Sequence, residues 1–358
     1  MVRKMREAVK PLGAHTAVGF VQESQKFNEI PYLKDNEGKL PPFIIAVGSR
    51  VRVMKAPSLL NLKEPAFIDQ IAKKQIGPDA YGRVSVLIGK FEQEGFSIPL
   101  CVFETQMGCS GTQINLKEAL YFANETGYLL DNRAVKSNGI YVIRAGTAAG
   151  VNSKNPSEAQ LQIGDITIAT ESYGAIGAVL QSIIGRIHFL PDMRESVEEL
   201  LSTLKADKIL GLSHDRTTLK TYSSTTLVLQ MQQEADRMGV RNFVGPNFSK
   251  DSLYSELGED GFAALRDTYG IISSEMEQLV VDSLAGEFRR AGVNVQSGLI
   301  SALVGAIPGK SFPETTAEKE AAAKAEENAV IIAAKVLWNI ARGNNPEEAL
   351  VQYYAHNT

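Results

Sequence analysis

The chain has 358 residues, 44% of them hydrophobic and 22% charged, with a formal net charge of -4. Basic and acidic residues are mixed along it, so no basic face marks a nucleic-acid-binding protein, and no apolar stretch reaches the roughly 18 residues that span a bilayer. Two cysteines, Cys101 and Cys109, cannot supply a disulfide framework for a chain of this length, so we expect a cytoplasmic protein with reduced thiols and no metal site.

Apolar runs alternate with amphipathic segments along the chain. Residues 1–42 are polar and are interrupted by Pro31, Pro41 and Pro42, so we expect an irregular N-terminal extension. Short apolar runs then predict strands at residues 43–47, 84–88, 98–103, 140–143, 166–169, 209–212, 242–244 and 295–303. Apolar residues at three-to-four spacing predict helices at residues 112–125, 195–205, 225–238, 277–290 and 317–342, with a last short helix beginning at Asn345 and Pro346. This alternation predicts a three-layer α/β/α sandwich around a mixed, mostly parallel central sheet.

Two segments place arginine beside glycine where predicted strands end. The first spans residues 46–52 and contains Gly48 and Arg52, and the second spans residues 143–150 and contains Arg144 and Thr147. Small residues let backbone N–H groups form a nest around an anion, and a guanidinium offers a planar pair of donors to a phosphate. The two segments together predict an oxyanion site, although each alone is also typical of a surface turn.

A third signal is acidic. Glu275 and Glu277 flank Met276 at the start of the helix predicted at residues 277–290. A carboxylate at a helix start is stabilised by the helix dipole and can accept two hydroxyl protons, such as those of a ribose diol. Without further context, the same residues are also explained as helix-start charges around a core methionine.

Taken in order along the chain, these segments resemble the motifs of the nucleoside phosphorylase family, which includes uridine phosphorylases and hexameric purine nucleoside phosphorylases. The motifs are, in sequence, Met107-Gly108, residues 143–150, Gly164-Asp165-Ile166 and Glu275-Met276-Glu277. The resemblance runs from about residue 43 to about residue 337. It implies the nucleoside phosphorylase-like fold, with residues 43–358 as a single domain that carries insertions near residues 55–82 and 173–220.

The resemblance also implies roles for single residues. The phosphate-binding residues would be Gly48, Arg52, Arg83, Arg144 and Thr147. Of these, Arg83 would reach the site of a neighbouring subunit. The ribose-binding residues would be Thr147, Glu275, Met276 and Glu277, and the base-binding residues Leu253 and Tyr254. Arg144 and Glu277 would be the catalytic pair.

The implied activity is pentosyl transfer. Phosphate would cleave the N-glycosidic bond of a ribonucleoside to give a free base and ribose 1-phosphate, in nucleoside salvage. Inorganic phosphate is then a co-substrate, no cofactor is required, and a homodimer is the minimal unit, with a hexamer as the larger alternative.

The identity of the base stays open between purine and uracil. Residues 251–259 lack the Gln and Arg with which uridine phosphorylases bind the base, and residues 303–307 lack the Asp that purine enzymes use as general acid. Two other functions also stay open: a nucleosidase that uses water in place of phosphate, and a non-catalytic relative that binds nucleosides.

Overall fold

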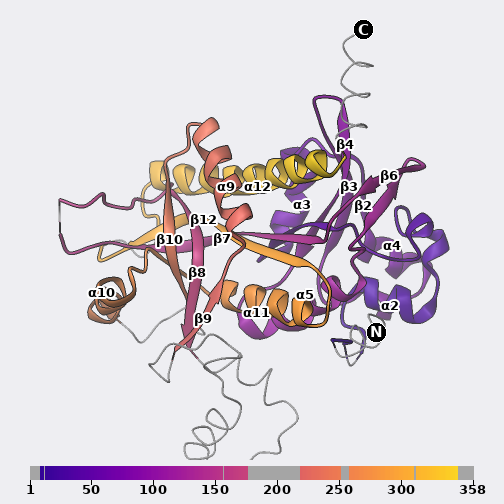
Figure 1. Cartoon of the computed structure of the whole chain (residues 1–358), viewed down its shortest axis with the longest axis horizontal. Coiled ribbons are helices and arrows are strands. Elements are labelled where there is room, and N and C mark those ends of the chain that lie inside the picture. Colours follow the sequence, from indigo (N-terminus) through magenta and orange to yellow (C-terminus); the bar gives the residue numbers. More distant parts are fainter. Residues whose placement is uncertain are drawn as a thin grey trace, which may run out of the picture.

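A mixed β-sheet runs through the computed structural model, which describes residues 9–11, 13–155, 157–175, 218–250, 258–309 and 312–345 (Figure 1). Its strands are β1 (Phe43–Val47), β2 (Lys63–Phe67), β3 (Val86–Gln93), β4 (Phe96–Glu104), β7 (Ile140–Val151), β8 (Ile166–Ala175), β9 (Thr218–Tyr222), β10 (Asn242–Ser249), β11 (Ser273–Glu275) and β12 (Val295–Ile307). Neighbouring strands follow the order β11-β10-β8-β12-β7-β1-β4-β3-β2, and β9 pairs with β8. A separate hairpin consists of β5 (Gly127–Leu130) and β6 (Arg133–Lys136).

The sheet has an open part and a closed part. In the open part, β1 pairs in parallel with β4 and β7, and β3 and β2 extend the edge in antiparallel fashion. In the closed part, β12 pairs in parallel with β7 and antiparallel with β8, while β10 pairs in parallel with β8 and β11. Strand β11 also pairs antiparallel with β7, through Ser273 with Gly150 and Ser274 with Ala149. Strands β7, β12, β8, β10 and β11 therefore close into a ring that resembles a small barrel.

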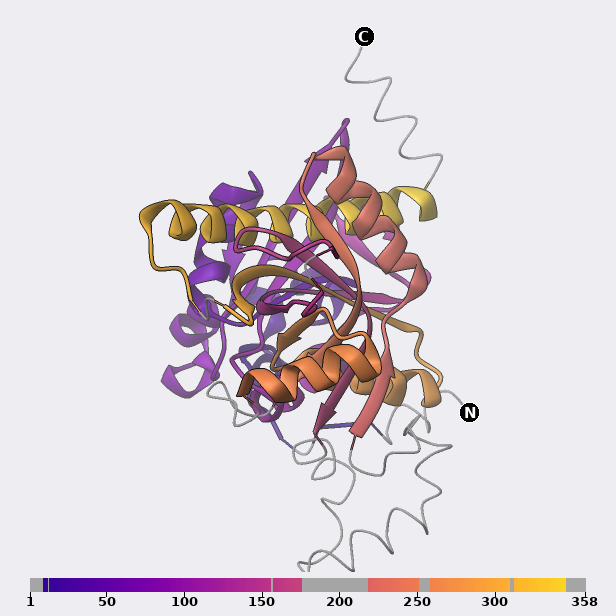
Figure 2. The same ribbon diagram turned by 90° about the vertical axis from the view of Figure 1, so that its left-hand side faces the viewer.

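Helices cover both faces of the sheet (Figures 1 and 2). One face carries α3 (Arg50–Leu59), α9 (Thr225–Arg237) and α12 (Thr316–Asn344). The other carries α2 (Ala17–Ser24), α4 (Ile68–Gln75), α5 (Cys109–Phe122) and α11 (Gln278–Arg290). Helix α10 (Gly258–Tyr269) packs Phe262 against the ring, and short 3-10 turns are η1 (Phe27–Glu29), η2 (Lys34–Asn36) and η3 (Pro78–Tyr81). None of the helices in the described part of the chain is long and apolar enough to cross a membrane.

Strand β1 shows how the sequence specifies these layers. Every one of its residues is fully buried, as expected of a strand with helices on both faces. Phe43, Ile45 and Val47 pack into the core that contains α12, whereas Ile44 and Ala46 pack into the core that contains α5 and α11. Because successive side chains of a strand point to opposite faces, one short apolar run serves both helical layers.

The structure confirms the predicted fold class, a mixed sheet between two helical layers. The predicted strands that fall on described residues correspond to β1, β3, β4, β7, β8, β10 and β12, and the predicted helices to α5, α9, α11 and α12. The strand predicted at residues 209–212, the helix at 195–205 and the last helix from residue 346 onward lie outside the described residues, as does most of the insertion near 173–220.

The expectation of an irregular N-terminal segment is wrong for residues 17–24, which form helix α2. Helix α2 begins after Thr16, whose hydroxyl accepts a hydrogen bond from the Gly19 N–H. Val18, Ile30 and Leu40 are fully buried in the same core as α5. The helical pieces here are too short to give a recognisable periodicity, which is why the sequence pattern missed them. The division of the chain into residues 1–42 and 43–358 stays a prediction.

The glycine-rich segment at residues 146–150 is strand rather than turn. It belongs to β7, and its backbone groups pair with β12 and β11. The segment is therefore not the turn that its composition suggested, because it pairs with β12 along one edge and with β11 at residues 149–150 of the other. The other predicted glycine turn, at Gly48, does follow a strand end, because β1 ends at Val47. Helix α3 begins at Arg50, so Arg52 lies in the first turn of a helix.

Candidate functional site

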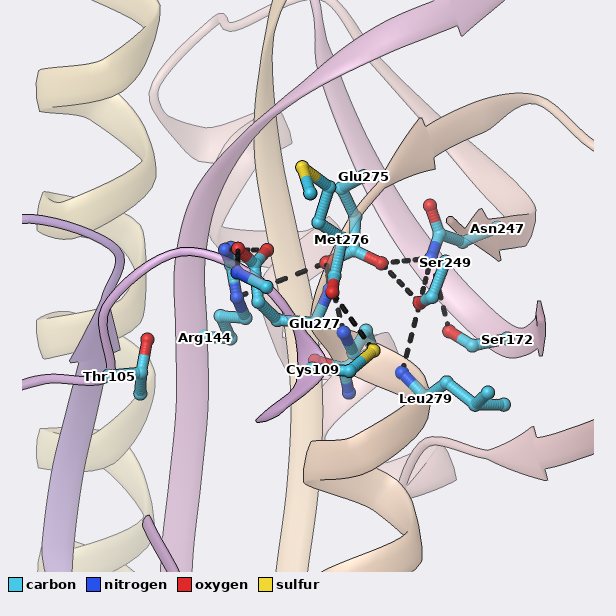
Figure 3. A network of polar contacts seen from close by, with 12 residues as sticks. Thr105, Cys109, Arg144, Ser172, Asn247, Ser249, Glu275, Met276, Glu277 and Leu279 are labelled. Atoms are coloured by element: carbon cyan, nitrogen blue, oxygen red, sulfur yellow. Dashed lines mark hydrogen bonds and ion pairs between the residues drawn. The ribbon is translucent and has the colours of Figure 1, made fainter. Parts of the chain in front are cut away.

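The candidate site lies where β1 ends and where β7 pairs with β11. Gly48 follows β1, Arg144 and Thr147 lie on β7, and Glu277 precedes α11. Closure of the ring brings Arg144 and Glu277 into contact although they are 133 positions apart in the chain. Figure 3 shows the two side chains pointing toward each other at one side of a polar network that continues through Glu275.

Arg144 is a buried arginine with unpaired donors. Its side chain is 3% exposed, and its Nη2 donates to the Glu277 carboxylate. It folds over Gly146, where an added Cβ would lie 1.8 Å from Nη1, so glycine at this position leaves room for the guanidinium. Within the described structure, Nε and Nη1 have no hydrogen-bond partner, and Nε lies 3.9 Å from the nearer oxygen of Glu275. Buried charged donors are costly when unpaired, so these two N–H groups indicate a site for an acceptor.

Arg52 approaches Arg144 beside Gly48. A Cβ added to Gly48 would lie 3.7 Å from Nη2 of Arg144 and 3.8 Å from Nη1 of Arg52. The two guanidinium groups therefore border the same small volume, next to a residue without a side chain. Nε and Nη2 of Arg52 each lie 3.0 Å from Oε2 of Glu326 on α12. Two guanidinium groups that converge beside a glycine suit a compact anion such as phosphate.

Glu277 is a buried carboxylate held between two donors. Its Oε1 accepts a hydrogen bond of 2.8 Å from the Gly108 N–H, and its Oε2 accepts from Arg144. Burial raises the pKa of Glu277 above its ordinary value, while the Arg144 charge and the Gly108 hydrogen bond act in the opposite direction. The loop between β4 and α5 therefore contributes directly to the site through its backbone.

Glu275 holds the start of α11 in place. Its Oε2 accepts hydrogen bonds from the backbone N–H groups of Glu277, at 2.7 Å, and Gln278, at 2.9 Å. Its Oε1 accepts from Nδ2 of Asn247, at 2.8 Å, and from the Ser249 hydroxyl (Figure 3). A carboxylate that accepts the first free N–H groups of a helix stabilises that helix end. Both oxygens of Glu275 are thus engaged within the chain, and the network fixes the backbone that carries Glu277.

Met276 and Thr147 are the more accessible of the predicted ribose-binding residues, and each is half-buried. The Met276 carbonyl accepts a hydrogen bond of 3.1 Å from the Cys109 thiol, so the first residue of α5 fixes the backbone between the two glutamates. Thr147 lies on β7, opposite Ala302 of β12, three residues beyond Arg144. Thr147 therefore shares strand β7 with Arg144, and Met276 lies between Glu275 and Glu277 in the chain.

Two other groups of predicted residues stand apart. Arg83 is exposed, and its backbone is held at both ends, since its N–H donates to the His15 carbonyl and its carbonyl accepts from the Gln106 side chain. It does not join Arg52 and Arg144 beside Gly48 in the described chain. Leu253 and Tyr254 lie outside the described residues.

Several supporting residues carry no clear signal in the sequence. Asn247 and Ser249 lie two residues apart on β10 and both donate to Glu275. Their spacing, which places two polar side chains on one face of a strand, is the only sequence signal for this role. Glu326, which pairs with Arg52, is one of four glutamates of α12, and nothing in the sequence distinguishes it from the others. Among the residues that the structure describes, no three His, Cys, Asp or Glu side chains group together as a metal site would require.

Comparison with solved structures identifies the fold as that of the nucleoside phosphorylases. No protein-family model matches the sequence, and no curated protein is significantly similar to it. Purine nucleoside phosphorylase from Toxoplasma gondii in complex with immucillin-H superposes with a TM-score of 0.55 at 18% identity, covering 93% of this chain and 100% of that chain. Uridine phosphorylase from Vibrio fischeri ES114 gives 0.54 at 17% identity, covering 88% and 99%.

A third solved structure of the same fold is a nucleosidase. The 5'-methylthioadenosine/S-adenosyl homocysteine nucleosidase of Campylobacter jejuni gives a TM-score of 0.52 at 12% identity, covering 83% of this chain and 98% of that chain. At these identities the likeness concerns the fold. The resemblance to nucleoside phosphorylases that the sequence motifs carry is thereby confirmed at the level of the fold, which both phosphorylases and a nucleosidase share.

Proposed function

We propose that the protein is a nucleoside phosphorylase, which transfers the ribosyl group of a ribonucleoside to inorganic phosphate. The observation that carries the proposal is the pair of guanidinium groups of Arg52 and Arg144 beside Gly48, next to the carboxylate of Glu277. Two buried donors of Arg144 have no hydrogen-bond partner among the residues that the structure describes, so the site has unused capacity to bind an anion. The solved structures of the same fold that are phosphorylases support the same conclusion.

The mechanism follows from where the charges lie. When the base departs with the electrons of the bond to C1', the ribose develops positive charge. A phosphate held by Arg52 and Arg144 would stabilise this charge and then form the new bond to C1', giving ribose 1-phosphate. Glu277, in contact with Arg144, would accept hydrogen bonds from the ribose hydroxyls and fix the sugar over the phosphate. Glu275 supports this arrangement by holding the backbone of Glu277.

The arginines favour phosphate over water as the nucleophile. A nucleosidase needs a base or a positioned water, whereas two guanidinium groups beside one glycine provide paired donors for an anion with several oxygens. The nucleosidase alternative is kept because a solved nucleosidase has the same fold. In our proposal Arg83 completes the phosphate site of a second subunit, since it is exposed and its backbone is fixed on both sides.

Product analysis tests the proposal. Purified protein is incubated with uridine, inosine or adenosine, with and without phosphate, and free base and ribose 1-phosphate are quantified by chromatography. Release of base only with phosphate supports a phosphorylase, and release without phosphate contradicts it in favour of a nucleosidase. Arg144→Gln is expected to abolish the phosphate-dependent activity. Arg237→Gln, at an arginine 67% exposed on α9, is the matched control and keeps it.

A further inference from the structure

Glu326 lies outside the proposed substrate-binding residues, yet it holds one of the two arginines. Its Oε2 lies 3.0 Å from both Nε and Nη2 of Arg52. The contact joins the first turn of α3 to the middle of α12, across 274 positions of the chain. One edge of the guanidinium is thereby used, and Nη1 remains as the nitrogen next to Gly48.

The helix that carries Glu326 is firmly packed at this point. Ala322, Ala325 and Ala329 are buried against the core on the same helix. A capping box closes the N-terminus of α12, because the Thr315 hydroxyl accepts from the Glu318 N–H while the Glu318 carboxylate accepts from the Thr315 N–H. Glu326 therefore offers its carboxylate from a rigid support, although its side chain is 33% exposed.

Arg52 has no comparable support of its own. It stands in the first turn of a ten-residue helix, and its side chain is 20% exposed. A free arginine side chain samples many rotamers, and ordering it costs on the order of 2 kcal/mol. The contact with Glu326 orders the Arg52 side chain before an anion binds, because two donors on one oxygen fix the plane of the guanidinium. The donor that faces Gly48 is then already in place.

A carboxylate close to an anion site also repels the anion. The Glu326 charge is paired with Arg52, and its side chain is partly solvated, so this repulsion is screened. Its contact is with the edge of the guanidinium that includes Nε, whereas the atom nearest Gly48 is Nη1. Orientation of Arg52 is therefore expected to outweigh repulsion. The two effects can be told apart because orientation strengthens phosphate binding and repulsion weakens it.

We propose that Glu326 is a positioning residue for phosphate: it fixes the Arg52 guanidinium so that Nη1 faces the anion beside Gly48 and Arg144. The proposal rests on the proposed phosphorylase function. It concerns phosphate and not the nucleoside, because Met276 and Glu277 are held from β11, α5 and α11 rather than from α12.

Steady-state kinetics of Glu326→Gln and Glu326→Asp test this role. In Glu326→Gln the KM for phosphate is expected to rise about 5- to 20-fold, with the KM for nucleoside and the Tm unchanged, because ground-state binding of one substrate is weakened. Glu326→Asp keeps the charge on a shorter side chain and is expected to fall between Glu326→Gln and wild type. Glu327→Gln is the matched control. Glu327 is the next residue of α12 and pairs with Lys324 at 3.7 Å, so its replacement is expected to leave every kinetic constant unchanged.

The outcomes separate this proposal from the one on which it rests. An unchanged or lower KM for phosphate in Glu326→Gln overturns the positioning role and leaves phosphorolysis intact. If the wild-type protein releases no base with phosphate, the proposed function fails instead. Calorimetric titration with inorganic phosphate then tests the role of Glu326 without requiring enzyme activity. A Kd for phosphate that is about 5- to 20-fold weaker in Glu326→Gln supports positioning. An equal Kd, or no phosphate binding by the wild type, overturns it.

Discussion

Replacing Gly146 with alanine tests whether the Arg144 guanidinium has to lie where it does. The added Cβ would be 1.8 Å from Nη1, 3.0 Å from Cζ and 3.5 Å from Nη2 of Arg144. Contacts of a Cβ below 3.0 Å essentially do not occur, so the guanidinium has to retreat by more than about 1 Å. Strand β7 cannot give way instead, because Gly146 pairs with Ser301 in the interior of the sheet.

Two measurable quantities change as a result. A shift of about 1 Å in a group that orients a reactant costs on the order of 100-fold in rate, so kcat/KM for phosphorolysis is expected to fall by about that factor. Overpacking at a buried site typically lowers the free energy of unfolding by about 1–3 kcal/mol. This is less than the roughly 3–5 kcal/mol that follows removal of one partner of a buried ion pair, because Gly146→Ala displaces Arg144 without deleting it.

The assay combines phosphate-dependent release of base with urea denaturation. Gly286→Ala on α11 is the matched control, because its Cβ would meet only Nη1 of Arg290 at 3.5 Å and Nη2 of Arg289 at 3.8 Å. We expect it to be fully active and more stable by about 0.5–1 kcal/mol, as glycine-to-alanine changes within helices are. Wild-type kinetics in Gly146→Ala would refute the argument that the placement of Arg144 determines activity.

Three further changes probe the same region. Gly48→Ala places its Cβ 3.7–3.8 Å from both arginines, so the fold is expected to tolerate it while the KM for phosphate rises about tenfold; an unaltered KM would contradict an anion site beside Gly48. Glu277→Gln removes the nearer of the two carboxylates beside Arg144 and is expected to lower the free energy of unfolding by about 3–5 kcal/mol in urea. Because burial raises the pKa of Glu277, the rate in wild type should decline on acidification at a pH above the ordinary value of 4.5, and a decline only below 4.5 would contradict a raised pKa of Glu277. Burial raises the pKa of Asp282 from 3.8 to about 7, so the folded chain keeps a proton that the unfolded chain releases; stability should fall as pH rises through this window, and Asp282→Asn should remove that slope in urea denaturation at about pH 5 and about pH 8.

Elements with a strong local pattern could be predicted from the sequence. β1 is a run of apolar residues, and α12 combines strong helix formers with a capping signal. β11 could not be predicted in this way, since its residues Ser273–Glu275 are polar and few. It is a strand because β7 and β10 supply its hydrogen-bond partners on either side. A local pattern does not record pairing partners elsewhere in the chain, and the partners of β11 on β7 lie more than a hundred residues away.

The same distinction holds for the candidate site, where single residues could be predicted but their contacts could not. The order of the motifs singled out Arg52, Arg144 and Glu277, each beside the end of a predicted strand or the start of a predicted helix, although β7 continues past Arg144 to Val151. The contacts that join them depend on tertiary structure: Arg144 meets Glu277 only when β11 pairs with β7, and Arg52 meets Glu326 only when α12 packs beside α3. Residue identity was therefore accessible from the sequence, and mutual geometry was not.

The closed ring of strands also determines when the candidate site can form during synthesis of the chain. A ribosome releases β7 and β8 well before β12, which inserts between them, and Arg144 emerges 133 positions ahead of Glu277. Until about residue 307 has left the exit tunnel, both strands expose unpaired edges, which are the surfaces that chaperones protect and that aggregate when unprotected. Nascent chains arrested before β12 should accordingly be insoluble and inactive rather than partly active.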